Sequence, residues 1–157
     1  MSLFKFPLQR LLDLRAKRQD EIARQLMQAR TAADDSRATH DALAAARTSG
    51  QEQLAQVRAA TPTVGEMASH AYALTQLDQR LAAASDALKV AEAQVDQIHV
   101  ALTGALQDRQ VLDRLRERML EAYRSTEASK DRTAMDAIAL QRFAQSNSDS
   151  PSNGEVS

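Results

Sequence analysis

The fold is decided by residues 74–105, LTQLDQRLAAASDALKVAEAQVDQIHVALTGA. Apolar residues recur there at alternating spacings of three and four, and most positions between them are polar or alanine. The recurring residues are Leu74, Leu77, Leu81, Ala84, Leu88, Ala91, Val95, Ile98, Leu102 and Ala105. This spacing keeps a narrow apolar stripe on one side of a helix, and such a stripe is buried against a second helix. The stretch therefore predicts one strand of a coiled coil.

The composition is typical of long helices rather than of a globule with a thick core. Among 157 residues there are 4 glycines, 3 prolines and no tryptophan, and aromatic residues make up 3%. The net charge of −1 gives no support to nucleic-acid binding, which rests on a basic surface. The lack of cysteine excludes disulfides and thiolate metal sites. No apolar run approaches the roughly 20 residues that cross a bilayer, and no signal peptide is evident, so we expect a cytoplasmic protein.

A second, weaker apolar seam runs through residues 8–57 and marks another helix. Polar residues interrupt it, but no proline intervenes and good helix formers dominate. Pro62 then breaks the helix, because proline cannot continue a helix interior. Thr63 and Glu66 have the spacing of a capping box, which marks the start of the next helix.

These signals predict an all-α protein, a long antiparallel two-helix coiled-coil hairpin with a disordered C-terminal tail. The expected parts are a single helical hairpin over 1–145, made of a helix over 8–60, a turn over 61–65 and a helix over 66–145, and a disordered tail over 146–157. Folding the chain at the turn also predicts facing residues. The expected pairs are Leu43 with Ala84, Ala29 with Ile98, Arg47 with Asp78, and Arg15 with Asp113.

The second helix is longer than the first, so a segment from Met119 to about Gln145 should extend beyond its partner. It holds several apolar side chains, namely Met119, Tyr123, Met135, Ile138 and Phe143. Three readings remain open. The segment is a binding surface, or it is partly disordered, or the N-terminal Leu3, Phe4 and Phe6 pack back onto it.

Residues that could carry chemistry are few. Neither a Gly-rich phosphate loop nor a nucleophile elbow occurs. Glu66 and His70 are four residues apart on one helix face, but two ligands are too few for a metal site. A narrow two-helix structure also offers no cavity that excludes water. We therefore expect no enzyme, no cofactor and no metal.

The predicted open end of the hairpin is basic. Residues 1–24 hold six basic and three acidic side chains, and the facing part of the second helix adds Arg109, Arg114, Arg116 and Arg118. One interpretation is salt bridging along solvated helix faces. The other is that this end enters an acidic hole or ring in a partner.

Segments at both ends of the chain match a known pattern. The chain opens with FKFPLQRLLDLR at 4–15 and DEIA at 20–23, and near its end lie Arg118, Tyr123 and MDAIA at 135–139. These segments resemble the two ends of FliJ, the flagellar export protein of bacterial type III secretion. Ala137 stands where the family often has an acidic residue. The resemblance covers about residues 3–143.

The resemblance implies a function in flagellum biogenesis, protein export and motility. FliJ proteins are antiparallel coiled coils that resemble the central stalk of rotary ATPases. They insert into the hexameric export ATPase and stimulate it, contact the cytoplasmic domain of the export-gate membrane protein, and help recycle export chaperones. By this analogy the ATPase-ring contacts are Leu8, Leu12, Arg15, Arg116 and Tyr123, and the export-gate contacts are Tyr72 and Leu77. The protein would then be cytoplasmic, peripherally associated with the inner-membrane export apparatus, and monomeric when isolated.

Other functions stay open at this point. The chain could be the corresponding stalk of an injectisome, or a self-associating coiled-coil scaffold. A helix lying on a membrane surface is disfavoured, because the polar faces carry mixed charge rather than an excess of Lys and Arg.

Overall fold

The computed structural model describes residues 3–148, which form two long helices and contain no strand. Helix α1 spans Gln9–Ala59 and helix α2 spans Val64–Ser148. The expected all-helical class with two long helices is therefore confirmed. Helix α2 continues three residues beyond the end expected at 145, and the rest of the expected disordered tail, residues 149–157, lies outside the described residues.

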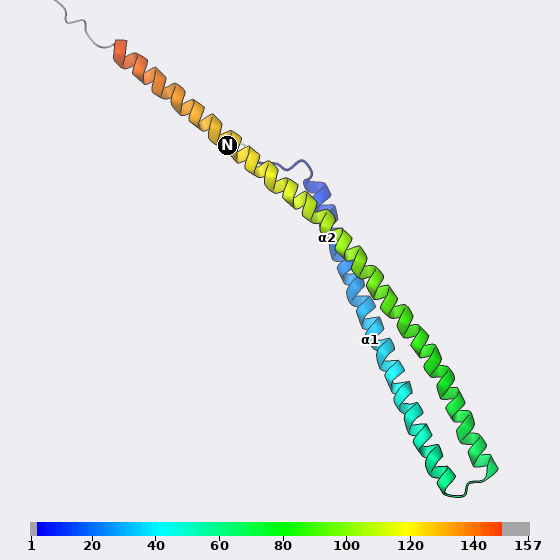
Figure 1. Cartoon of the computed structure of the whole chain (residues 1–157). Helices are drawn as coiled ribbons and strands as arrows, with labels where there is room; N and C mark the ends of the chain where they lie inside the picture. Colours follow the sequence, from blue (N-terminus) through cyan, green and yellow to red (C-terminus); the bar gives the residue numbers. More distant parts are fainter. Residues whose placement is uncertain (1–2, 149–157) are drawn as a thin grey trace, which may run out of the picture. The chain divides into compact units, whose positions relative to one another are not determined.

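The chain divides into two compact units, and both helices contribute to each. The hairpin unit is Leu14–Asp108, in which α1 and α2 lie side by side and are joined by a tight turn (Figure 1). The terminal unit consists of Met1–Asp13 and Arg109–Ser157. Each unit has its own contacts.

Ion pairs between the helices show that α2 runs antiparallel to α1 in the hairpin unit. Residue numbers rise along α1 as they fall along α2. The pairs are Arg15 with Asp108 at 2.9 Å, Arg37 with Glu92 at 2.6 Å, and Arg47 with Asp78. The expected pair Arg47–Asp78 is confirmed. The Glu92 carboxylate, hydrogen-bonded to the Arg37 guanidinium, raises the pKa of Arg37 further.

The expected pair of Arg15 with Asp113 is wrong. Arg15 binds Asp108, and the Asp113 carboxylate lies 3.6 Å from Arg109, one turn earlier in its own helix. Asp113 is five positions after Asp108, which turns the helix by about 140°, so only one of the two can face α1. Counting from the turn gives the position along α2 but does not choose between these two carboxylates.

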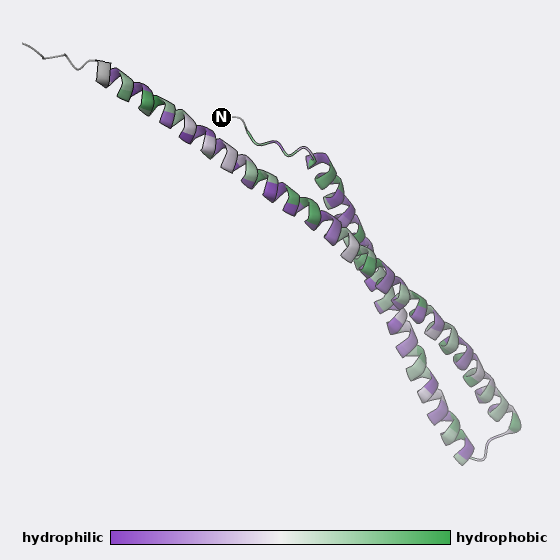
Figure 2. Cartoon of the chain, turned by 45° about the horizontal axis from the view of Figure 1, so that its top comes forward, coloured by the Kyte–Doolittle hydropathy of each residue, from purple (hydrophilic) through white to green (hydrophobic). Residues whose placement is uncertain are grey.

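The core is the pair of apolar seams, and it is thin. All ten positions of the α2 seam in residues 74–105 are at least half-buried, and the most buried α1 positions of this unit are Ile22, Leu26, Ala29, Ala33 and Leu54. Figure 2 shows hydrophilic and hydrophobic residues alternating along both helices, as a narrow seam requires. Ala29 and Ile98 line the same hollow, in agreement with their expected pairing. The pairing of Leu43 with Ala84 stays a prediction.

Gly50 lets the helices approach closely near the turn. A Cβ atom built on Gly50 would lie 3.1 Å from Cδ2 of Leu74, which is tighter than ordinary van der Waals contact. A glycine in a helix interior costs up to about 1 kcal/mol relative to alanine, and here the close packing of Leu74 explains its presence.

The turn is built by Thr61, Pro62 and Thr63. The amide of Ala60 donates to the carbonyl of Val57, and Thr61 then takes a left-handed conformation with φ 51°, which ends α1. The expected capping box is present. The Thr63 amide donates to the Glu66 carboxylate at 2.9 Å, and the Glu66 amide donates to Oγ1 of Thr63 at 3.3 Å.

This cap makes stability depend on pH. The hydrogen bonds from Thr63 hold the pKa of Glu66 below its ordinary value of 4.5. Because the folded pKa is lower than the unfolded one, the stabilisation is present above the unfolded pKa and is lost as the pH falls through the folded pKa. We expect Glu66→Gln to lower the melting temperature at neutral pH, with the difference from wild type disappearing in strong acid. Melting curves by circular dichroism at several pH values measure it.

A matched substitution separates the cap from a general effect of charge. Glu52 is an exposed glutamate within α1, far from a helix N-terminus. Glu52→Gln should leave the melting temperature at neutral pH nearly unchanged. If Glu66→Gln behaves in the same way, the capping box contributes nothing to stability.

Candidate functional site

The N-terminal segment packs against α2 in the terminal unit. The rings of Phe4 and Tyr123 have centroids 5.6 Å apart at 47°, and Phe6 is buried. Pro7 precedes α1, and the Gln9 amide donates to the Phe6 carbonyl at 3.2 Å, which fixes the entry into the helix. Of the three readings for the extending segment, packing of the N-terminus is found at Phe4 and Phe6. Leu3 stays exposed.

Four of the five expected ATPase contacts lie in this unit, but they differ in accessibility. Leu8 and Arg116 are exposed, Tyr123 is half-buried under Phe4, and Leu12 is buried. Arg15 belongs to the hairpin unit, where its guanidinium is engaged with Asp108. The unit therefore brings Leu8 and Arg116 to the surface and uses Leu12 for packing.

Besides Leu8, the terminal unit exposes Leu11, Val111 and Leu115, which the sequence analysis did not single out. Leu11 lies three residues after Leu8, and Leu115 lies four residues after Val111, so each pair shares a helix face. All four are exposed. In the sequence, the one feature that marks these residues is that they are apolar and stand next to a seam position.

The terminal unit is also basic. Residues 3–13 and 109–118 carry six basic and three acidic side chains. Two of the acids have neighbours, since Gln9 donates to Asp13 at 2.9 Å and Arg109 lies beside Asp113. The exposed bases are Lys5, Arg10, Arg114, Arg116 and Arg118. A shallow hollow lined by Phe4, Lys5, Phe6, Gln9 and Arg116 combines aromatic and basic groups, so this surface suits an acidic partner.

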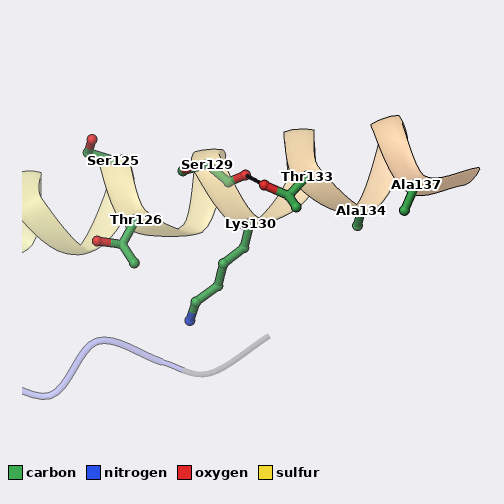
Figure 3. Close-up of a pocket in the computed structure, with 7 residues that line it drawn as sticks. All are labelled: Ser125, Thr126, Ser129, Lys130, Thr133, Ala134 and Ala137. Atoms are coloured by element: carbon green, nitrogen blue, oxygen red, sulfur yellow. Dashed lines mark hydrogen bonds between the residues drawn. The ribbon is translucent and has the colours of Figure 1, made fainter. Parts of the chain in front are cut away.

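The part of α2 beyond Tyr123 is a single helix whose side chains are exposed up to residue 146, Glu127 excepted. Figure 3 shows a hollow along it lined by small residues, with Lys130 reaching away from the helix. The Thr133 hydroxyl donates to the Ser129 carbonyl at 2.9 Å, and Lys130 pairs with Glu127 at 3.0 Å, which raises the pKa of Lys130. Both contacts are local and stabilise this part of the helix.

The two expected export-gate contacts lie in the hairpin unit. Tyr72 is 69% exposed, whereas Leu77 belongs to the seam and contacts the Gly50 position. Only Tyr72 is therefore available to a partner in this state.

Within residues 3–148, no group of three or more His, Cys, Asp or Glu side chains could hold a metal ion. The same residues contain no helix that is long and apolar enough to cross a membrane.

A family model described as the flagellar FliJ protein matches residues 4–148, which include both helices and the N-terminal segment. The chain belongs to the FliJ family. Membership makes it a component related to flagellar protein export. No curated protein and no solved structure matches the chain.

Proposed function

We propose that this FliJ family member is the central stalk of the flagellar type III export ATPase. It inserts its terminal unit into the hexameric ring and stimulates ATP hydrolysis without hydrolysing ATP itself. It acts in the cytoplasm, at the export apparatus of the inner membrane. The observation that supports the proposal most strongly is an exposed surface with apolar and basic residues in the terminal unit of a family member.

The chemistry of this surface suits an acidic, partly apolar cavity. Leu8 and Leu11 would be buried on contact, while Arg116 and its basic neighbours would face carboxylates of the ring. Burying apolar area supplies affinity, and opposite charges guide the approach and select the partner. Leu12 and Tyr123 support this surface by packing, because one is buried and the other lies under Phe4.

The turn end of the hairpin unit is our candidate for the contact with the export gate. Tyr72 presents an aromatic ring with a hydroxyl group to solvent, a side chain that protein interfaces favour. Leu77 would act indirectly by keeping α2 packed against Gly50. Contacts with export chaperones complete the proposed role.

ATPase stimulation tests the proposal. Adding the wild-type chain to the purified export ATPase should raise its rate, and Arg116→Glu should weaken the apparent affinity about tenfold, because one contact with the acidic ring becomes repulsive. Arg80→Glu is the matched control, since Arg80 is an exposed arginine of the hairpin unit. If the wild-type chain changes neither ATP hydrolysis nor ring assembly, the stalk function is refuted. Equal losses in the two variants would refute the assigned surface.

A further inference from the structure

The side of α2 that faces away from α1 carries a second set of residues at coiled-coil spacing. Its members in the hairpin unit are Ala83, Asp86, Val90, Ala93, Gln97 and Val100. All are exposed, and Val90 and Val100 are 69% and 71% accessible. The outward side of a solvated helix normally holds charged residues, whereas only one of these six is charged. We call these residues the outer seam.

We infer that the outer seam packs against the outer seam of a second copy of this chain, in antiparallel orientation. The order of large, small and polar side chains along the outer seam is self-complementary when two copies run in opposite directions. A two-fold axis at the level of Ala91 and Glu92 sets Val90 opposite the Ala93 position of the other copy, and Val100 opposite Ala83. Each large side chain then meets a small one, as interdigitating helices require.

The polar members of the seam also match under this axis. Gln97 falls opposite Asp86 of the second copy, where the amide can donate a hydrogen bond to the carboxylate. Because the axis is two-fold, this contact and the Val–Ala contacts each occur twice. A parallel pairing would instead place valine on valine and Asp86 on Asp86, which leaves gaps and adds repulsion.

The charges that flank the seam select the same register. Lys89 and Asp96 lie on one edge of it, seven residues apart, and the antiparallel pairing brings Lys89 beside Asp96 of the other copy, again twice. Within one chain the Lys89 ammonium lies 3.8 Å from the Asp86 carboxylate, and both side chains are exposed. Such a pair contributes little, so Lys89 can exchange it for Asp96 at small cost.

The contact is small and therefore reversible. A face of 18 residues is about 27 Å long, and two such faces bury less than the roughly 1,600 Å² of a standard stable interface. The chain is then a monomer when dilute and a dimer when concentrated. The outer seam belongs wholly to the hairpin unit, so dimerisation does not depend on the terminal unit or on ATPase stimulation.

Sedimentation velocity over about 1 µM to 1 mM tests the inference. The wild-type chain should shift from monomer to dimer with concentration, and Val100→Asp should stay monomeric while keeping its helical circular dichroism. Met27→Asp is the control, because Met27 is as exposed as Val100 but lies on α1 outside the seam. It should dimerise like the wild type. A wild-type chain that stays monomeric throughout, or a Val100→Asp chain that still dimerises, overturns the proposal.

Charge exchange and cross-linking test the register. Lys89→Asp and Asp96→Lys should each weaken the dimer about tenfold, because two attractions become repulsions, and the double variant should restore it. The chain has no cysteine of its own. When Ala83→Cys and Val100→Cys chains are mixed and oxidised, disulfides between the two variants should predominate. A predominance of disulfides between identical variants indicates parallel pairing and overturns the register.

Discussion

Replacing Leu26 with alanine should lower the free energy of unfolding by about 2 kcal/mol. Leu26 is among the most buried side chains of the hairpin unit, at 5% exposed, and lies between Ile22 and Ala29 on the α1 seam. Removing a buried leucine loses its transfer free energy and leaves a cavity, which costs roughly 2–5 kcal/mol in thick cores. The lower end applies here, because among the described residues no side chain is fully buried, and solvent can reach the gap.

The neighbouring residue provides the control. Met27 is 70% exposed, so Met27→Ala should change the free energy of unfolding by less than about 0.5 kcal/mol. Urea denaturation followed by helical circular dichroism measures both variants. Equal losses at the two positions would mean that the seam between α1 and α2 does not hold the hairpin unit together.

The contrast between Leu26 and Met27 is visible in the sequence, because the three-four spacing alone separates the two residues. The same spacing identified the α2 seam, including small members such as Ala84 and Ala91 that a search for large apolar residues would miss. Periodicity is a local property of one helix, so it can be read without knowledge of the fold. The capping box of Thr63 and Glu66 was predictable for the same reason.

Contacts between distant segments were predicted less well. Position along the helix sufficed for Arg47 and Asp78, but the pairing of Arg15 depended on which side of α2 each aspartate faces. The candidate site shows the same limit. The family resemblance named Tyr123 as an ATPase-ring contact, yet Tyr123 is half-buried and its ring packs against Phe4, since the first residues of the chain fold back onto α2. No periodic pattern in so short a segment indicates where its rings will pack.

A second large effect is expected from a substitution in the folded-back N-terminal segment. Phe6→Ala should release the N-terminal segment from α2, because Phe6 is 7% exposed and anchors the residues before α1. Losing its burial should favour local opening by about 2 kcal/mol, or roughly thirtyfold in the opening equilibrium. Hydrogen exchange at the Gln9 amide reports this directly, since that amide donates to the Phe6 carbonyl. Its exchange should accelerate by a similar factor.

Leu3→Ala is the matched control, because Leu3 is an apolar residue of the same segment that is 88% exposed. It should leave exchange at Gln9 unchanged. If Phe6→Ala also leaves it unchanged, burial of Phe6 does not hold the segment.

The stalk function adds a second expectation. Release of Phe4 uncovers Tyr123, so Phe6→Ala should alter ATPase stimulation although Phe6 itself is too buried to touch the ring. If ATPase stimulation is unaltered although the Gln9 amide exchanges fast, the ATPase ring does not contact the surface around Tyr123.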